Sequence, residues 1–151
     1  MTEKTSPPLS GKTLSPDMTN SELYAKVRRN RYNDDDTAVS NRMWNAIGVY
    51  CEAKLAADRD LVTQNDRRKL DYTIVRPGSL NTEEGSGKVA AGKVHLGKSI
   101  SREDVAEVIV RCINTPSTIG LAFDVVGGDS PIAHAVDEVG GQRVDTFEGR
   151  Y

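Results

Sequence analysis

The sequence predicts an α/β protein in which parallel strands are flanked by helices. A long segment from about residue 38 to 65 has helical periodicity, and two short segments, at 70–78 and 121–126, have the composition of strands. Helical patterns with N-terminal capping residues follow the strands, near 101–115 and 130–140. The order helix, strand, helix, strand, helix predicts a layer of helices on a sheet.

The bulk composition limits the kinds of partner. The chain has 151 residues, of which 37% are hydrophobic and 28% are charged, as expected of one globular domain. Its formal net charge of -2 gives no general attraction for nucleic acids or anionic membranes. We therefore expect a small-molecule substrate, no nucleic-acid partner and no membrane partner.

The first part of the chain is polar. Residues 1–20 are rich in Pro, Ser, Thr and Lys and contain too few apolar residues to offset the entropy of ordering. The following KVRRNRYNDDD places arginines beside aspartates, so its charges largely cancel, which favours a solvated linker over a nucleic-acid patch. We expect residues 1–35 to form a flexible polar tail and linker, and residues 36–151 to form the folded part.

The longest helix is expected from about Ala38 to Asn65. Apolar residues recur there at a spacing of nearly 3.6 residues and define one stripe, which should face the core. The stripe consists of Met43, Ile47, Cys51, Leu55 and Val62.

Two strands are expected. LDYTIVRPG, at 70–78, is rich in β-branched residues; Pro77 holds Arg76 in an extended conformation, and Gly78 then opens a turn. LAFDVV, at 121–126, is almost continuously apolar, which is typical of a strand buried on both faces of a parallel sheet.

A shorter helix should follow the first strand after a Gly-rich connection. Ser101 can cap this helix with Asp104 at the third helical position, and Pro116 marks its end. Its buried face is expected to contain Val105, Val108, Ile109, Cys112 and Ile113.

A last helix should follow the second strand, within GGDSPIAHAVDEVGG. Ser130 is expected as its N-cap and Pro131 as its first helical residue. Gly140 is expected to stop it.

Residues 92–99 read GKVHLGKS and satisfy the phosphate-loop pattern G-x-x-x-x-G-K-[ST]. A working phosphate loop joins a buried strand to a helix whose first turn contains the lysine. Here Val94 and Leu96 alternate as in an extended segment, and the next helix should begin only after Ser101, so Lys98 falls outside its first turn. We interpret the match as accidental; an NTPase whose ATP binding depends on Lys98 is the competing hypothesis.

No metal site is predicted. Cys51 and Cys112 lie far apart and form no C-x-x-C pair, and His95 and His134 are isolated from one another and from other ligand types at a suitable spacing. The unpaired cysteines and the lack of an apolar leader or spanning segment indicate a cytoplasmic protein, with the nucleus as the alternative location.

Tyr50 and Lys54, in YCEAK, lie one helical turn apart and project from the same side of the expected long helix. They flank an edge of the apolar stripe, as residues lining a cleft do. A phenol has an ordinary pKa of about 10, and a neighbouring ammonium lowers that pKa by favouring the phenolate. The pair can therefore form an acid–base group, although a tyrosine packed at a helix edge beside a solvated lysine has the same spacing.

Five runs of the sequence resemble, in chain order, the atypical short-chain dehydrogenase/reductases, and in style the NmrA-like and biliverdin-reductase-B-like proteins. The resemblance extends from about Tyr32 to Tyr151 and includes YCEAKLAADRDLV, LDYTIVRPGSL, GSGKV, ISREDVAEVIVRCI and LAFDVVGGDSPI. It implies a Rossmann-like three-layer fold with NAD or NADP as cofactor. The implied activity is transfer of hydride between the nicotinamide and a small organic substrate.

The resemblance also implies roles for individual residues. Tyr50 matches the proton-donating tyrosine of the family, and Lys54 matches the lysine that holds the nicotinamide ribose. GKVHLGKS falls in a connection near the substrate side. The loop beside the nicotinamide end of the cofactor is matched by Pro77, Gly78, Ser79 and Leu80.

Families of this type begin with a strand and a G-x-x-G-x-x-G turn that seats the pyrophosphate, and no such turn precedes the long helix here. We therefore expect an incomplete Rossmann-like fold whose N-terminal nucleotide half is missing, which describes a truncated family member. The alternative is a non-catalytic remnant that acts as a protein-interaction or cofactor-sensing module. Either form could associate with itself or with another protein through an exposed sheet edge.

Overall fold

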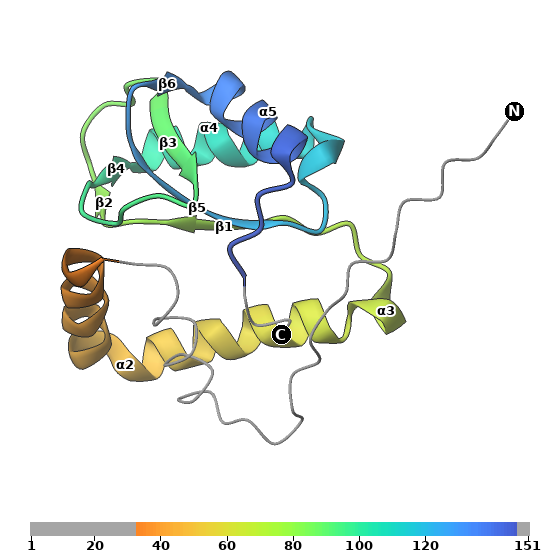
Figure 1. Cartoon of the computed structure of the whole chain (residues 1–151), viewed down its shortest axis with the longest axis horizontal. Coiled ribbons are helices and arrows are strands. Elements are labelled where there is room, and N and C mark those ends of the chain that lie inside the picture. Colours follow the sequence, from red (N-terminus) through yellow and green to blue (C-terminus); the bar gives the residue numbers. More distant parts are fainter. Residues whose placement is uncertain (1–32, 148–151) are drawn as a thin grey trace, which may run out of the picture.

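The computed structural model describes residues 33–147 and shows a three-layer α/β fold (Figure 1). Helix α2 (Asp34–Thr63) lies on one face of the sheet, and helices α4 (Arg102–Ile113) and α5 (Ile132–Gln142) lie on the other (Figure 1). The α/β fold class with flanking helices is confirmed. Residues 1–32 of the expected tail and linker lie outside the described residues.

The main sheet has the strand order β1-β5-β3-β6. Strands β1 and β5 are parallel, with Ile74 opposite Ala122, whereas β3 is antiparallel to both β5 and β6. Two further short strands, β2 and β4, pair in parallel as a second sheet. The strand bounds are β1 Ile74–Pro77, β2 Leu80–Asn81, β3 Lys88–Gly92, β4 Ile100–Ser101, β5 Ala122–Gly127 and β6 Ser130–Pro131.

Strand β5 is buried on both faces, which explains its apolar composition. Phe123 and Val125 face α4 and α5, where they join the larger core cluster, while Ala122 belongs to a smaller cluster on the α2 face. The larger cluster also contains Val89, Ile100, Val108, Cys112, Leu121, Ile132, Ala135, Val136 and Val139. Both expected strands are present, the first only over Ile74–Pro77 of the expected 70–78, and β5 has the predicted parallel neighbour β1. The Gly-rich stretch expected as a connection instead contains β3, which pairs with β5 in the antiparallel direction.

Helix α2 differs from the expected long helix in its start and in its burial. It begins at Asp34, where the side chain of Asn33 accepts the Asp36 N–H, and its backbone departs from helical angles at Ile47 (φ -138, ψ 38). A short helix, α3 (Asn65–Arg68), follows it. The apolar stripe is buried only in part: Met43 and Ile47 are 42% and 47% exposed. The expectation was wrong for these two residues, because the sheet-facing cluster engages α2 from Leu55 onward.

Helix α4 begins as predicted, since Ser101 Oγ accepts the Asp104 N–H at 3.0 Å. Val108 and Cys112 are buried, as expected. Ile109 and Ile113 are 46% and 77% exposed, so their expected burial was wrong. They line a groove with Thr73 and Val75 beside β1, an edge strand of the described sheet that has no further strand outside it to cover them.

Helix α5 corrects three expectations about its ends. Ser130 lies in β6, where it pairs with Val89 of β3, and Pro131 occupies the N-cap position with no side-chain cap. The helix continues through Gly140 to Gln142, and its C-cap is Arg143, whose φ is 53°. Gly140 is needed for packing, because a Cβ there would collide with the side chain of Ser117. A 3-10 turn, η1 (Pro116–Thr118), supplies that serine after α4.

Candidate active site

The carboxyl ends of the parallel strands β1 and β5 meet at one edge of the sheet. This is where open α/β sheets place their ligands. Gly78 follows β1, and its N–H donates to the carbonyl of Val125 at 2.9 Å. A Cβ at Gly78 would lie 2.8 Å from Val126 Cγ1 and 3.2 Å from the carbonyl oxygen of Lys98, so the turn predicted there requires glycine.

The segment that leads into β4 closes over this edge. The Ser99 carbonyl accepts the Gly127 N–H at 3.1 Å, and the Ile100 N–H donates to the Ser79 carbonyl at 2.9 Å. Asn81 Nδ2 donates to Ser99 Oγ at 3.0 Å. The loop after β1 is therefore held by the segment at Ser99 and Ile100, and its residues Ser79 and Leu80 remain exposed.

The sequence-predicted cofactor loop lies at this edge of the sheet. Pro77 is the last residue of β1, and the three residues after it turn toward β2. Pro77 is exposed and Gly78 is half-buried. The loop offers a hydroxyl at Ser79 beside an apolar side chain at Leu80, which is 46% exposed. Contact with the nicotinamide remains a prediction for all four residues.

GKVHLGKS does not form a phosphate loop. Gly92 ends β3 with a φ of +107°, and the following residues run as an irregular connection to Ile100. Helix α4 begins at Arg102, so Lys98 does not lie in a helical first turn. The structure therefore gives this segment no helix N-terminus at which to bind a triphosphate.

Tyr50 and Lys54 lie one turn apart on α2, in the helical part after the deviation at Ile47. Both are exposed, and Tyr50 retains 61% of its accessible surface, so its hydroxyl is not sealed in the core. Figure 1 shows α2 running below β1 and β5. The roles of Tyr50 and Lys54 remain predictions that this exposure allows.

The second half of α2 is fastened beneath β1. Arg76, on β1, lies 3.5 Å from the Asp58 carboxylate through its Nε, and its guanidinium lies 5.0 Å from the centre of the Phe147 ring. Leu55, Leu61 and Val62 pack against the cluster formed by Ile74, Ala122 and Phe147. This packing fixes α2 just beyond the turn that contains Lys54.

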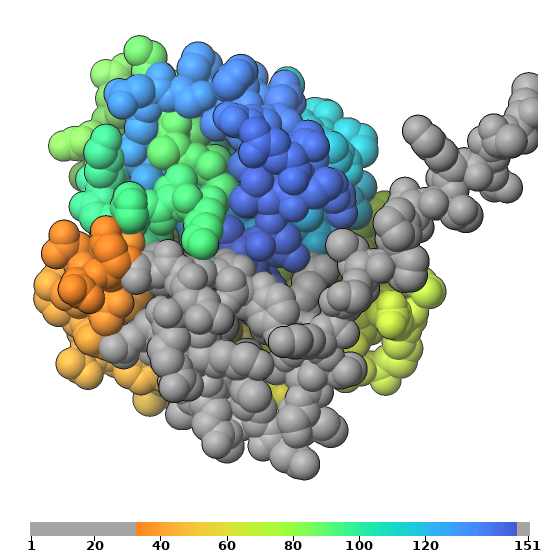
Figure 2. All heavy atoms as spheres, in the orientation of Figure 1, coloured from red at the N-terminus to blue at the C-terminus, as the bar shows by residue number. Residues whose placement is uncertain are grey.

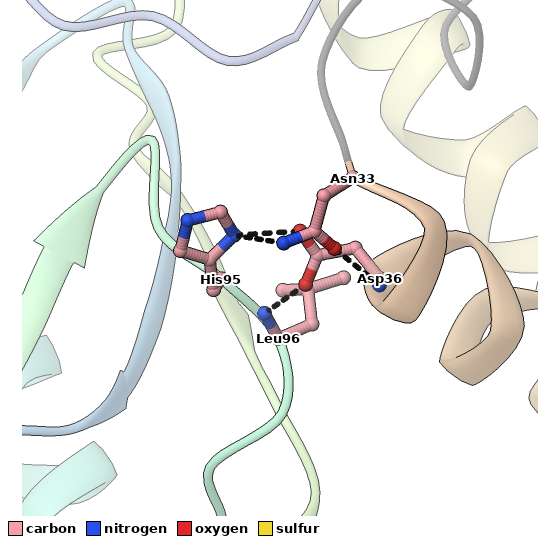
Figure 3. Close-up of polar contacts among 4 residues, drawn as sticks. All are labelled: Asn33, Asp36, His95 and Leu96. Atoms are coloured by element: carbon pink, nitrogen blue, oxygen red, sulfur yellow. Dashed lines mark hydrogen bonds and ion pairs between the residues drawn. The ribbon is translucent and has the colours of Figure 1, made fainter.

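The first turn of α2 is joined to the 93–99 connection by a buried carboxylate (Figure 3). Asp36 is 2% exposed; its Oδ2 accepts a hydrogen bond from His95 Nδ1 at 2.8 Å, and its Oδ1 accepts the Leu96 N–H at 2.8 Å. Sequence reasoning missed this contact. Asn33 and Asp36 have the spacing of an N-cap pair, which signals a helix start but not a partner 60 residues away.

A second buried carboxylate organises the Gly-rich loop before β3. Asp104 is 4% exposed and accepts hydrogen bonds from the N–H groups of Ser86 and Gly87, at 3.1 and 2.8 Å, and from Ser86 Oγ. Burial raises the pKa of this carboxyl, but the hydrogen bonds together lower the pKa below its ordinary value. Asp104 therefore fills a backbone anion site with a protein carboxylate.

An apolar groove lies beside the open edge of β1. Its cavity volume is about 540 Å³, and Thr73 and Val75 form one wall while Ile109 and Ile113 of α4 form the other. Cys112, at its base, has a raised thiol pKa because of burial. Among residues 33–147 no group of three or more potential metal ligands is assembled, and no helix has the length and apolar character to cross a membrane.

Comparison with known proteins identifies the family. The model of the NAD(P)H-binding family matches residues 27–116, which is more than half of the chain. The chain belongs to the NAD(P)H-binding family. The resemblance inferred from its motifs is therefore confirmed at the level of the family, and NAD or NADP is the family's cofactor.

The relatives of this NAD(P)H-binding protein agree with that assignment. The chain is 35% identical to the UPF0659 protein C216.03 of Schizosaccharomyces pombe over 105 residues, covering 70% of this chain and 42% of that protein. It is 40% identical to the uncharacterized sugar epimerase YhfK of Bacillus subtilis over 97 residues, covering 64% and 44%. The crystal structure of the oxidoreductase YlbE of Lactococcus lactis superposes with a TM-score of 0.59 at 30% identity, covering 64% of this chain and 42% of that one. The chain thus spans less than half the length of these relatives.

The described residues fit one end of a dinucleotide better than the other. The exposed hydroxyls of Tyr50 and Ser79 and the Lys54 ammonium are suitable partners for a ribose and a carboxamide. Within residues 33–147 the pyrophosphate has no comparable seat. Residues 85–90 spell G-x-G-x-x-A, but they lead into a strand, and their Ser86 and Gly87 N–H groups already bind Asp104.

Proposed function

We propose that this NAD(P)H-binding protein is an oxidoreductase-type member of its family that acts on a small organic substrate. The observation that carries the proposal is the exposed Tyr50–Lys54 pair on a helix that is fixed beneath the parallel strands of an NAD(P)H-binding fold. The nicotinamide would supply or accept the hydride. We place the protein in the cytoplasm, where the free thiols of Cys51 and Cys112 would stay reduced.

In this proposal hydride moves between the nicotinamide and a substrate carbon, and Tyr50 gives a proton to, or takes one from, the oxygen bonded to that carbon. The Lys54 ammonium stabilises the negative charge that develops on the phenol oxygen, and it can donate a hydrogen bond to a ribose hydroxyl. Ser79 and Leu80 would line the opposite side, with a polar and an apolar contact respectively. Each role uses a side chain that is exposed in the structure.

Titration of NADH or NADPH fluorescence with the full chain tests cofactor binding. We expect Lys54→Ala to weaken binding about tenfold, a loss of roughly 1.4 kcal/mol, whereas Tyr50→Phe should retain binding and lose turnover. Lys88→Ala, an exposed lysine on β3, is the matched control and should bind normally. An absence of nicotinamide binding by the unmodified chain would reject cofactor use by this product.

A specific observation favours a second candidate function, that of a non-catalytic interaction module. The groove beside β1 exposes Ile109 and Ile113, and β1 is an open edge of the described sheet. Its occupant would be an extended apolar strand that adds to β1 by backbone hydrogen bonds. Light scattering should then show association that Ile113→Asp abolishes. Val110→Asp, also on exposed α4 surface but outside the groove, should leave association unchanged.

A further inference from the structure

The Asp36 carboxylate forms a long-range contact from the third helical position of α2. At this position an acidic side chain usually turns back to the N-cap backbone. Here both carboxylate oxygens instead reach the 93–99 connection, through His95 Nδ1 and the Leu96 N–H, each at 2.8 Å (Figure 3). Asn33 Nδ2 also lies 3.2 Å from His95 Nδ1, so the imidazole contacts the N-cap residue of α2 as well as the carboxylate (Figure 3). Figure 2 shows the first turns of α2, in orange, packed against the green segment at this point.

The desolvation of Asp36 makes this contact specific. Its side chain is 2% exposed, whereas the side chain of His95 is 78% exposed, so the histidine covers the carboxylate from the solvent side. A buried carboxylate without partners is strongly destabilised, and each hydrogen bond to it is stronger than one between neutral groups. The first turn of α2 therefore has one well-defined position on the connection.

This contact attaches α2 on the N-terminal side of the Tyr50–Lys54 pair. A second attachment, on the C-terminal side, is the ion pair of Asp58 with Arg76 of β1 at 3.5 Å. Tyr50 and Lys54 lie between the two attachments, and so does the deviation from helical geometry at Ile47. Around the pair the helix surface is open, with Val49 86% and Tyr50 61% exposed, and neither described core cluster includes a residue between Asp36 and Leu55.

We propose that Asp36 and His95 are positioning residues for the Tyr50–Lys54 pair. The non-helical backbone at Ile47 divides α2 into two parts, so an attachment on one part alone leaves the direction of the other undetermined. The contact with the 93–99 connection removes this freedom, and the same connection fixes the loop after β1 through Ser99 and Ile100. Helix α2 and the loop after β1, which form the two sides of the candidate site, are thereby both held by the same segment. The positioning role rests on the proposed function of Tyr50 and Lys54, but the effect of the Asp36–His95 contact on α2 can be tested without cofactor.

Hydrogen exchange of residues 34–54, followed by mass spectrometry on the full chain, tests the proposal. Asp36→Asn and His95→Ala should each raise exchange about tenfold through Tyr50 and Lys54, which corresponds to roughly 1.4 kcal/mol of local stability. His95→Asn keeps an N–H donor at the same reach and should restore protection. Asp60→Asn is the matched control, because Asp60 lies on α2 beyond both attachments and the substitution breaks a 2.7 Å ion pair with Arg68 of α3.

Fluorescence gives an independent reading. Trp44 is the single tryptophan, and it lies between Asp36 and Tyr50, with its indole 3.7 Å from where a Cβ at Gly48 would be. Its emission should shift in Asp36→Asn and His95→Ala and not in Asp60→Asn. If Asp36→Asn does not fold, His95→Ala decides the question, since its side chain is exposed.

The outcomes separate this inference from the proposed function. Exchange in Asp36→Asn and His95→Ala that equals that of Asp60→Asn would overturn it, as would increased exchange that stops before Ile47. Failure of the unmodified chain to bind NADH or NADPH would reject the proposed function, while the exchange result would still decide the positioning contact. If the cofactor does bind, an unchanged affinity in His95→Ala would overturn the positioning role.

Discussion

The carbonyl oxygen of Ser99 lies against Gly127. It accepts the Gly127 N–H at 3.1 Å and would be 2.5 Å from a Cβ at that position. The segment before β4 therefore approaches the end of β5 more closely than any side chain permits. This approach holds the back of the candidate site together.

Gly127→Ala should lower the free energy of unfolding by about 1–3 kcal/mol, because the methyl group would force Ser99 away from β5. Chemical denaturation followed by circular dichroism measures the change. Gly97→Ala is the control: it lies in the same connection, has no atom within 4 Å of an added Cβ and should be nearly neutral. Equal stability of the two variants would show that the Ser99 approach is not needed.

Asp104→Asn should destabilise the protein by about 3 kcal/mol, because an amide cannot accept all the hydrogen bonds that the buried carboxylate receives. The loss should be greatest in the loop that contains Ser86 and Gly87, whose N–H groups point at Asp104. Thermal unfolding and hydrogen exchange of that loop measure it. Glu107→Gln, on the exposed side of the same helix, should change little; a similar loss in both variants would contradict this role.

Acid should destabilise the protein through the same kind of group. Burial raises the pKa of Asp36, but the hydrogen bonds from His95 and Leu96 have the larger combined effect and lower that pKa below its ordinary value of 3.8. The pKa of Asp104 is also below this value. A carboxyl with a depressed folded-state pKa contributes stability above its unfolded pKa and loses it as pH falls through its folded pKa. The unfolding free energy should thus fall below about pH 4. Urea titrations should show a shallower fall in Asp104→Asn, and an identical slope would count against the prediction.

Arg76→Ala should cost about 1 kcal/mol through loss of the Asp58 ion pair and the contact with the Phe147 ring. Arg68→Ala should cost less, about 0.5 kcal/mol or below, although its ion pair with Asp60 is shorter. The reason is exposure: the Arg76 and Asp58 side chains are 23% and 24% exposed, against 37% and 56% for Arg68 and Asp60. Urea denaturation of both variants checks the order, and a larger loss in Arg68→Ala would reverse the argument.

The sequence by itself determined the helices and strands whose signals are local. The Ser101 cap, the turn at Gly78 and the buried composition of β5 each depend on neighbouring residues, and each is found where the pattern predicts. The same is true of the motifs that led to the family, since runs such as LDYTIVRPGSL are read without knowing the fold. The rejection of GKVHLGKS as a phosphate loop likewise followed from the position of the next helix cap.

The tertiary structure decided which faces are covered and which distant residues meet. Apolar periodicity could not show that Ile109 and Ile113 lie beyond the outermost strand, because burial depends on the neighbours that the sheet provides. Nor could it show that the Asp36 side chain binds His95 and Leu96 instead of its own helix backbone, since a contact across some 60 residues leaves no local signal. Local hydrogen bonding and periodicity are written along the chain, whereas the enclosure of a carboxylate or the exposure of an isoleucine exists only once the chain has folded.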